Sequence, residues 1–220
     1  MKDNIERLDN DEDYYGEFGK QFLSNSDIKS LLENPSQFKH SEKTLPMLIG
    51  NYFHTAMMEP DKLDDYPILD VATRNNKAYK ESAMGELIML QREVDEITML
   101  TDKMKGNMDI FDIIYAKGNK FEVPMIKELH SEMWKGKADI VTDTHVIDLK
   151  TTSDISKFKS SAWVYNYDSQ AYLYQEFFGK PMKFIVGCKK TLQLGVFECS
   201  PEFIERGRDK VLDAIISWRK

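Results

Sequence analysis

Apolar residues in the first half of the chain recur at the spacing of an α-helix, between recognisable capping and stop residues. The pattern predicts a short helix capped by Asn25 or Ser26 and ended by Pro35, then helices over 45–58, 81–105 and 107–116. The segment 61–80 is polar and rich in turn residues, which predicts a loop. The helix over 45–58 is apolar on most of its faces, so we expect it to be buried.

The pattern changes near residue 122 to short apolar runs that are typical of strands. Strands are predicted over 125–133, 138–142, 146–151, 183–188 and 194–198. A helix over 161–178, ended by Gly179 and Pro181, precedes the fourth strand, and Pro201 opens a last helix to Trp218. Helices followed by a β-β-β-α-β-β-α order predict an α/β (α+β) fold, with a central mixed sheet flanked by helices.

Length and charge set the expected domain organisation. A chain of 220 residues fits one domain. Residues 1–17 carry seven acidic and two basic side chains, which accounts for −5 of the net charge of −7. We therefore expect 1–20 to be an acidic, flexible arm. Residues 21–220 would form one domain, with a helical part over 21–120 and a sheet core over 121–220.

Membrane and redox signals are weak in this sequence. No apolar run is long enough to cross a membrane, and the N-terminus lacks the charged-then-apolar pattern of a signal peptide. Cys188 and Cys199 have no companion cluster of Cys or His, which argues against a zinc site or an iron–sulphur cluster. The expectation is a cytoplasmic protein in a reducing compartment, with no membrane partner.

Two aspartates stand in the middle of predicted strands, where apolar residues are expected. If the intervening turn is centred on Asp143–Thr144, Asp139 lies directly opposite Asp148, on the same face as Lys150. Like charges at opposed positions destabilise a strand pair unless something positive lies between them. Lys150 and a divalent cation are the obvious positive groups, because carboxylate oxygens suit hard cations. The alternative is three solvated charges on the wet face of a hairpin.

Four more polar residues fit the same site. Glu128, on the preceding predicted strand, would supply a third carboxylate, and His54 lies on an otherwise apolar helix. Gln170 and Tyr174 lie one turn apart on the predicted helix over 161–178. Each also has an ordinary explanation: a solvent-facing glutamate, a hydrogen-bonded core histidine, or a packed aromatic face. A packed aromatic face does not account for Gln170, because a buried amide needs hydrogen-bond partners.

Taken in this order, the residues resemble the PD-(D/E)XK nuclease superfamily, and most closely its branch with the RecB nuclease domain and exodeoxyribonuclease VIII (RecE), of phage or prophage type. The resemblance covers roughly 22–178. It rests on Gly50 and His54, Glu128, Asp139, Asp148-Leu149-Lys150, Gln170 and Tyr174, and on the segments FLSNSDIKSLLENPSQFKH, LIGNYFHTAMMEPDKLDDY, IDLKTTSDISKF and YDSQAYLY. The chain departs from the family pattern in the bulky residues after Gly50 and in the acidic arm. The implied fold is a restriction-endonuclease-like core with an N-terminal helical part.

The resemblance implies a metal site for Mg²⁺ or Mn²⁺. Asp139, Asp148 and the Leu149 carbonyl would hold the ion at the scissile phosphate. Glu128 and His54 would complete a second metal position or its water shell. Phosphodiester cleavage at neutral pH needs an activated nucleophile and neutralisation of charge on the phosphate, and divalent metals provide both.

The resemblance also assigns catalytic roles to residues beyond the metal ligands. Lys150 would orient or help to deprotonate the attacking water. Adjacent carboxylates favour the ammonium form, which suits the holding of a phosphate or a water molecule better than the removal of a proton. Gln170 and Tyr174 would support the site or touch the DNA strand.

The implied activity is a metal-dependent DNA exonuclease that degrades linear duplex DNA from 5′ ends and leaves single-stranded tails for recombination or repair. The resemblance further suggests a ring-like homo-oligomer and a single-strand annealing protein as a partner. Two alternatives stay open: an endonuclease or single-strand-specific nuclease on the same core, and a non-catalytic module that binds DNA ends or proteins.

Overall fold

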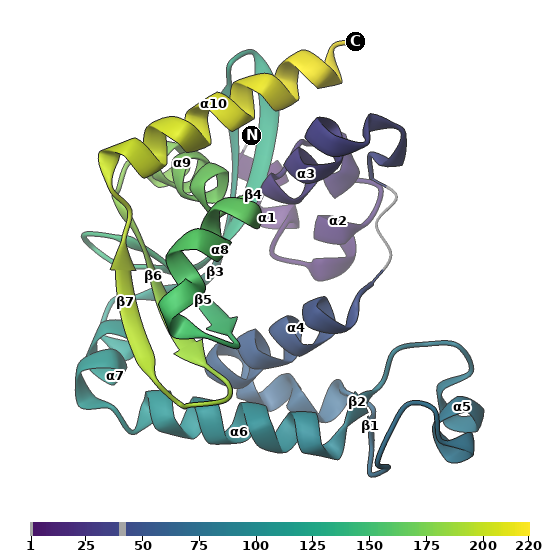
Figure 1. The fold of residues 1–220 in the computed structure, drawn as a ribbon. Helices are drawn as coiled ribbons and strands as arrows, with labels where there is room; N and C mark the ends of the chain where they lie inside the picture. Colours follow the sequence, from purple (N-terminus) through teal and green to yellow (C-terminus); the bar gives the residue numbers. More distant parts are fainter. Residues whose placement is uncertain (1, 40–42) are drawn as a thin grey trace.

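A computed structural model describes residues 2–39 and 43–220, and in it a five-stranded sheet lies between two layers of helices (Figure 1). Along the sheet the strands follow the order β3 (Lys120–Leu129), β4 (Glu132–Val141), β5 (Val146–Thr152), β6 (Met182–Cys188) and β7 (Leu194–Glu198). Strands β5 and β6 are parallel and the other neighbours are antiparallel. The predicted mixed sheet flanked by helices is therefore confirmed.

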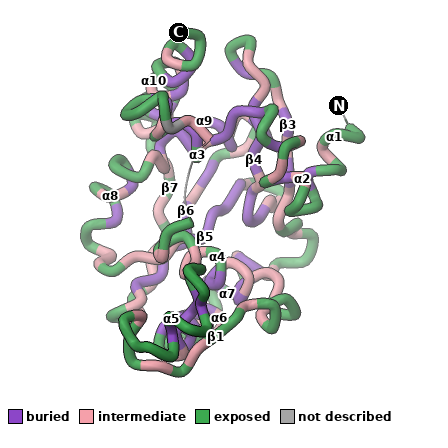
Figure 2. Tube along the Cα trace, turned by 90° about the vertical axis from the view of Figure 1, so that its right-hand side faces the viewer, coloured by how far each residue is buried: buried purple, intermediate pink, exposed green. Residues whose placement is uncertain are grey.

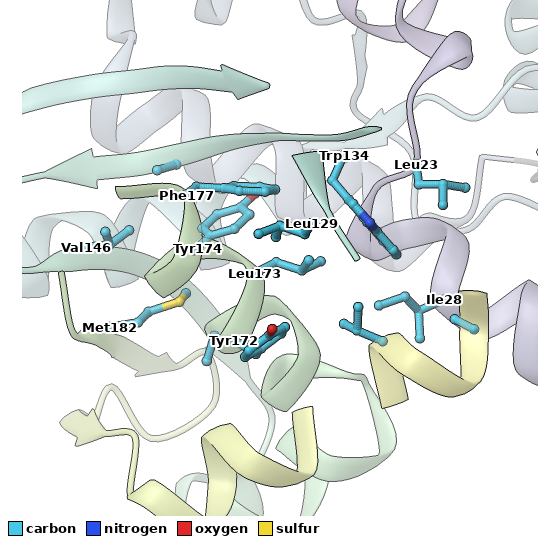
Figure 3. Packing of buried hydrophobic residues seen from close by; sticks show 14 of the residues in the cluster. Leu23, Ile28, Leu129, Trp134, Val146, Tyr172, Leu173, Tyr174, Phe177 and Met182 are labelled. Atoms are coloured by element: carbon cyan, nitrogen blue, oxygen red, sulfur yellow. The ribbon is translucent and has the colours of Figure 1, made fainter. Parts of the chain in front are cut away.

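One face of the sheet is covered by α3 (Asn25–Glu33), α8 (Phe158–Val164), α9 (Tyr167–Phe178) and α10 (Pro201–Trp218). In Figure 3, Leu173 and Phe177 of α9 lie among Leu129 and Trp134 of the sheet, and these side chains belong to one buried cluster. Burying a large apolar side chain stabilises the fold by about 1.5–3 kcal/mol. This cluster therefore fixes α9 firmly against β4 and β5.

The other face is covered by α4 (Leu45–Met58), α6 (Gln91–Lys105) and α7 (Met108–Tyr115). Ile147 and Leu149 of β5 pack in the cluster on this face, whereas Val146 packs against α9. Because successive side chains of a strand alternate, Asp148 and Lys150 lie on the face of the sheet that α9 covers. Figure 2 shows the middle strands as the buried centre of the molecule, with β5 buried over most of its length.

Short elements complete the chain. A two-stranded parallel sheet and helix α5 lie between α4 and α6, and 3₁₀ turns and two short helices occupy the connections. Their bounds are α1 Lys2–Arg7, α2 Asp11–Tyr15, η1 Gly19–Gln21, η2 Pro35–Gln37, η3 Pro60–Asp65, β1 Ile68–Leu69, α5 Lys77–Ala83, β2 Met89–Leu90 and η4 Ile155–Lys157. No helix of the described residues is long and apolar enough to cross a bilayer.

The acidic N-terminal segment, which the sequence predicted to be a flexible arm over 1–20, packs against the sheet in this structure. Leu8 and Tyr14 are buried in a cluster with Ile126 of β3. Asp11 of α2 pairs with Lys137 of β4, with 2.7 Å between Oδ1 and Nζ. The segment therefore lies along β3 and β4. Residue 1 of the predicted arm and the last residue of the segment FLSNSDIKSLLENPSQFKH, residue 40, lie outside the described residues.

Positive φ angles at residues other than glycine explain three of the wrong element boundaries. His130 and Ser131, with φ of 55° and 64°, form the tight turn between β3 and β4, so the strand predicted over 125–133 is two strands. Asn166, with φ of 58°, divides the helix predicted over 161–178 into α8 and α9. Met84, with φ of 47°, ends α5, so the helix predicted over 81–105 begins only at Gln91.

Candidate active site

Strands β4 and β5 separate at Asp139. The register predicted from the turn is confirmed where Ile140 pairs with Ile147, but the backbone ladder ends there. Ala138 packs against α9 whereas Ile140 packs against α4, although residues two apart share a face in a regular strand. Strand β4 is therefore irregular at Asp139. Its carboxylate Oδ2 accepts a hydrogen bond of 2.7 Å from the Leu149 N–H, which the ladder no longer satisfies.

Three potential metal ligands converge at this gap, from three different elements. His54 of α4, Glu122 of β3 and Asp139 of β4 each present one ligand atom, and these atoms lie within 4.8 Å of one another. His54 Nδ1 is 3.2 Å from Asp139 Oδ2. The β3–β4 register places Glu122 opposite Asp139, and a φ of 49° at Glu122 interrupts the ladder there. The local distortion of both strands turns two carboxylates toward one imidazole.

Glu128, the predicted third carboxylate, is not brought to this site. It is exposed and pairs with Met133, close to the turn that joins β3 to β4. The position was predicted from a strand that ran through this turn. With the turn at 130–131, the glutamate across from Asp139 is Glu122. The Phe-Glu-Val run that contains Glu122 carried no other signal of function.

The second half of the site lies on the α9 face of β5. Gln170 Nε2 donates a hydrogen bond of 2.5 Å to Asp148 Oδ1, and the Lys150 ammonium contacts Asp148 Oδ2. The exposed fractions of the two charged side chains are 3% for Asp148 and 16% for Lys150. Lys150 Nζ also lies 4.9 Å from the ring centre of Tyr167, a residue that the sequence did not single out. The charges of this half are paired within the protein.

Tyr174 acts on the strand rather than on the carboxylates. Its hydroxyl donates a hydrogen bond of 2.9 Å to the Lys137 carbonyl, two residues before Asp139. Burial, with smaller contributions from nearby anions, raises the Tyr174 pKa well above its ordinary value, so the hydroxyl keeps its proton. Gln170 therefore reaches the site directly, whereas Tyr174 fixes the β4 backbone that leads to it.

The electrostatics of the three converging ligands favour a cation. Burial raises the pKa of Glu122 to about 7, and the negative charge of Asp139 adds to the effect. Burial also opposes the charged form of Asp139, but His54 outweighs it and the Asp139 pKa is lowered. Burial lowers the pKa of His54, but Asp139 outweighs this effect, so the His54 pKa is raised. Anions crowded in this way repel each other until a positive ion lies between them.

The paired half of the site behaves differently. Burial raises the pKa of Asp148 to about 6, with Asp139 adding and Lys150 opposing. Burial opposes the charge of Lys150, yet the Asp148 carboxylate outweighs it and the Lys150 pKa is raised above its ordinary value. Lys150 is thus an ammonium ion at neutral pH. It suits the binding of a phosphate oxygen or a water molecule better than the removal of a proton.

The donor set fits a divalent metal ion. Two carboxylates and an imidazole from separate elements form a small group beside the opening in the sheet, and oxygen donors suit Mg²⁺ and Mn²⁺. A Cβ added at Gly50, one turn before His54, would meet no atom within 4 Å, so the α4 side of the site has open space. The arrangement can hold a metal ion beside a fixed ammonium group. Together these two positive groups can bind and polarise a phosphodiester.

The fold and the site together define a domain of the PD-(D/E)XK type. Over residues 20–215 the chain matches the family described as PDDEXK-like domain of unknown function (DUF3799), and it belongs to this family. The predicted resemblance to the PD-(D/E)XK superfamily is thereby confirmed. No curated protein matches the chain.

Solved structures are similar to this chain to different degrees. A candidate exonuclease from Eubacterium rectale is similar with a TM-score of 0.70 at 18% identity, over 96% of this chain and 85% of that chain. A phage related exonuclease from Haemophilus somnus 129PT gives a TM-score of 0.39 at 12% identity, over 90% and 93%. An alkaline exonuclease from Laribacter hongkongensis gives 0.40 at 11%, over 98% and 91%. The first similarity establishes the fold but not the activity, because one fold can host many different functions.

Proposed function

We propose that this protein is a metal-dependent deoxyribonuclease that degrades linear duplex DNA from its 5′ ends and leaves single-stranded tails for recombination or repair. The observation that carries the proposal is the convergence of His54, Glu122 and Asp139 beside the paired Asp148 and Lys150. Membership of a PDDEXK-like family supports it. The 5′ to 3′ direction and the duplex substrate rest on the resemblance to exodeoxyribonuclease VIII.

His54, Glu122 and Asp139 would hold Mg²⁺ or Mn²⁺, and the imidazole favours Mn²⁺ of the two. When bound, the ion would lower the pKa of an attacking water and neutralise charge on the phosphate. Asp148 and the Leu149 carbonyl, which the resemblance adds to the ligands, are part of the proposal. In this structure the Asp148 carboxylate is turned to Lys150 and Gln170.

Lys150 would bind a non-bridging oxygen of the phosphate or hold the attacking water. The ammonium group is positioned by the Asp148 carboxylate on one side and by the face of Tyr167 on the other. Gln170 fixes Asp148, and Asp148 in turn fixes Lys150. Donors that are held in place before the reaction contribute more to rate than mobile ones, because no reorganisation is needed when charge develops.

The test of this function uses purified protein, Mg²⁺ or Mn²⁺, and three DNA substrates. Linear duplex labelled at its 5′ ends, the same duplex labelled at its 3′ ends, and closed circular duplex separate an exonuclease from an endonuclease and give the polarity. Lys150→Met should slow degradation roughly 10²- to 10³-fold, whereas Lys103→Met, which replaces an exposed lysine of α6, should leave it unchanged. Degradation that is indifferent to Lys150 and to chelation of the metal would end the proposal.

We also propose assembly into a ring-like homo-oligomer and cooperation with a single-strand annealing protein, as the resemblance implies. A ring around the DNA would keep one molecule on its substrate through many cleavage steps. Light scattering on the purified chain tests the first point, and only monomers at micromolar concentration would contradict it. Co-purification with a single-strand annealing protein tests the second point.

A further inference from the structure

Three consecutive large apolar side chains face solvent at the end of α8. The exposed fractions are 47% for Trp163, 70% for Val164 and 63% for Tyr165. Single exposed apolar residues are ordinary on protein surfaces, whereas several neighbouring ones are more typical of a binding surface. The Trp163 ring is covered by the Arg206 guanidinium, 3.8 Å from the ring centre. Val164 and Tyr165 are the more exposed pair.

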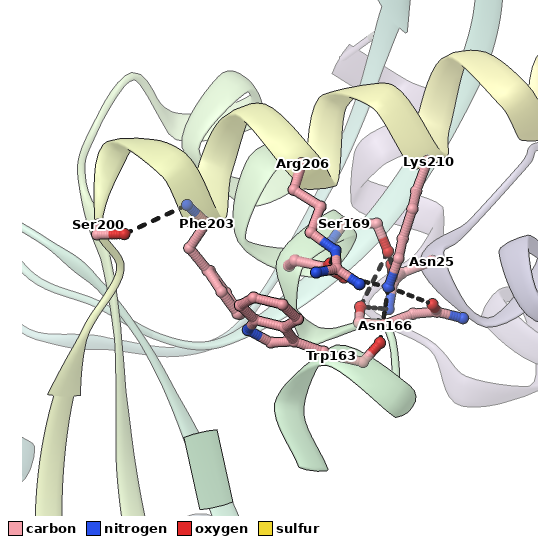
Figure 4. Close-up of polar contacts among 9 residues, drawn as sticks. Asn25, Trp163, Asn166, Ser169, Ser200, Phe203, Arg206 and Lys210 are labelled. Carbon is pink, nitrogen blue, oxygen red and sulfur yellow. Dashed lines mark hydrogen bonds and ion pairs between the residues drawn. The ribbon is translucent and has the colours of Figure 1, made fainter. Parts of the chain in front are cut away.

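A polar network holds the turn that presents these residues (Figure 4). Asn166, which follows Tyr165, has a φ of 58°, a conformation that costs an L-residue free energy unless its surroundings fix it. Lys210 Nζ of α10 donates hydrogen bonds to the Trp163 carbonyl at 2.7 Å, to Asn166 Oδ1 at 2.9 Å and to Asp168 Oδ1 at 2.8 Å. The network holds the break between α8 and α9 in one geometry.

Three further contacts tighten the same turn. The Asn166 carbonyl accepts hydrogen bonds from Asn25 Nδ2 of α3 at 3.2 Å and from Ser169 Oγ at 2.9 Å. A Cβ added at Gly207 of α10 would lie 2.0 Å from the Asp168 carbonyl, so α10 touches the start of α9 backbone to backbone. Elements α3, α9 and α10 therefore converge on one kink. The fold therefore holds Trp163, Val164 and Tyr165 in a fixed position, and these three residues form an exposed apolar corner.

The corner is continuous with the candidate active site. The ring centres of Tyr165 and Tyr167 are 5.9 Å apart, and the Tyr167 ring centre is 4.9 Å from Lys150 Nζ. Tyr165 is thus two contacts from the ammonium group assigned to the scissile phosphate. Lys157 and Lys159 precede the corner on η4 and α8, and both are exposed. The surroundings combine aromatic faces with positive charge, which is the composition of surfaces that bind single-stranded nucleic acid.

We propose that Tyr165, with Val164 beside it, is a platform on which an unpaired nucleobase of the DNA stacks next to the phosphate held at Lys150. This inference rests on the proposed nuclease function and deepens it, because it names an unpaired nucleotide as part of the substrate. Every base has a π face, so stacking of this kind is independent of sequence. The rigid turn keeps the entropy cost of binding low, since the platform has its bound geometry before DNA arrives.

The test measures binding by fluorescence anisotropy in EDTA, so that no arm of it needs cleavage. Three DNAs are compared: a blunt duplex, the same duplex with a short single-stranded overhang, and that overhang with abasic sites. The variants are Tyr165→Ser, the conservative Tyr165→Phe, and Phe111→Ser as a matched control. Phe111 is 44% exposed on α7, in the helix layer across the sheet. Melting curves verify that each variant is folded.

We expect wild-type protein to bind the overhang more tightly than its abasic form. Tyr165→Ser should weaken overhang binding by roughly 5- to 150-fold, equivalent to the ~1–3 kcal/mol of one stacked base, and should erase the abasic penalty. Tyr165→Phe and Phe111→Ser should bind as wild type does. An equal abasic penalty in wild type and Tyr165→Ser, or none in wild type, would overturn the platform. If the protein cleaves DNA but shows no abasic penalty, the nuclease function holds and the platform is wrong. If it shows the penalty but does not cleave DNA, the platform holds and the nuclease function is wrong.

Discussion

The two halves of the candidate site differ in how their charges are balanced. On the α9 face, Asp148 is bound by Lys150 and Gln170, so anion and cation neutralise each other within the protein. At the gap between β4 and β5, Glu122 and Asp139 share one imidazole, and the Glu122 pKa rises to about 7 because burial and the neighbouring anion oppose its charge. The half on the α9 face is electrostatically complete without a ligand. The half at the gap has two carboxylates for one imidazole, so a bound cation would neutralise its remaining charge.

This difference assigns a task to each half. A complete ion pair with a fixed ammonium group is suited to holding a substrate anion or a water molecule in one position. A crowded pair of carboxylates is suited to binding a metal ion. Substitutions in one half should therefore affect metal binding, and substitutions in the other should affect turnover. A substitution that changes both equally would contradict this division.

The largest effect is expected for Asp139→Asn. The amide oxygen can still accept the Leu149 N–H, which now bonds Asp139 Oδ2 at 2.7 Å, so the gap between the strands should keep its shape. Loss of the charge should weaken Mn²⁺ binding in isothermal titration and lower the cleavage rate about 10³-fold or more, since a metal ion contributes several kcal/mol to the transition state. Asp143→Asn, in the exposed β4–β5 turn, is the control. Mn²⁺ affinity that survives Asp139→Asn would place the metal elsewhere.

Lys150→Met tests the other half. We expect a cleavage rate roughly 10²- to 10³-fold lower, the usual cost of losing one preorganised electrostatic contact. Mn²⁺ affinity should be retained, because Lys150 contacts Asp148 rather than the three converging ligands. The substitution leaves a buried carboxylate unpaired, so the double variant Asp148→Asn/Lys150→Met is needed to separate lost stability from lost chemistry. If Lys150→Met also abolishes Mn²⁺ binding, the two halves are one unit.

Gln170→Leu should have a smaller effect of the same kind. Gln170 touches neither the three converging ligands nor the substrate in this proposal, and acts only by holding Asp148 through the 2.5 Å hydrogen bond. Residues that orient a site in this way typically change activity by about 10- to 100-fold. The decrease should appear in kcat, with Mn²⁺ affinity unchanged. Gln175→Leu, on the same helix, should behave as wild type, and a similar loss in both variants would point to general damage of α9.

Sequence reasoning reached the second half of the site more completely than the first. The Asp148-Leu149-Lys150 run lies on one regular strand, so alternation alone predicts that Asp148 and Lys150 share a face. The partner Gln170 was found because an amide is out of place on a packed helix face. Helix 45–58 and the last three elements also kept their predicted bounds within a residue or two, because proline and glycine mark their ends.

The first half depended on distortions that periodicity does not record. Glu122 has a positive φ, Asp139 interrupts its own ladder, and a turn of His130 and Ser131 sets which glutamate faces the aspartate. None of these residues is a glycine or an asparagine, so the usual signals for left-handed backbone were missing. The positive φ of Asn166 carried such a signal, since asparagine tolerates that conformation. The break between α8 and α9 was therefore the most predictable of the errors.

Lys135 sharpens the comparison, because it is a buried ammonium like Lys150 but forms no ion pair with any residue in the described ranges. Its Nζ donates to the Tyr14 carbonyl and lies 4.1 Å from the Tyr14 ring centre. Burial lowers the Lys135 pKa to about 8, with Lys39 adding, whereas a carboxylate neighbour raises that of Lys150. Lys150 of β5 therefore stays a cation because it has a carboxylate partner. Lys135 of the neighbouring strand β4 is shifted toward the neutral form because it has none.

The lowered pKa of Lys135 predicts that the free energy of unfolding depends on pH. This effect should be smaller than those of the substitutions in the site. Between the folded pKa of about 8 and the ordinary value of 10.5, the folded protein binds fewer protons than the unfolded chain. The free energy of unfolding should therefore rise with pH across this window and fall as pH drops through 8. Relative to Lys135→Met, wild type should gain on the order of 1–3 kcal/mol between pH 7.5 and pH 9.5 in urea titrations with EDTA. Lys103→Met, which removes an exposed lysine of α6, should track wild type across this range. A constant difference between wild type and Lys135→Met would mean that Lys135 stays charged across this pH range although it has no ion-pair partner among the described residues.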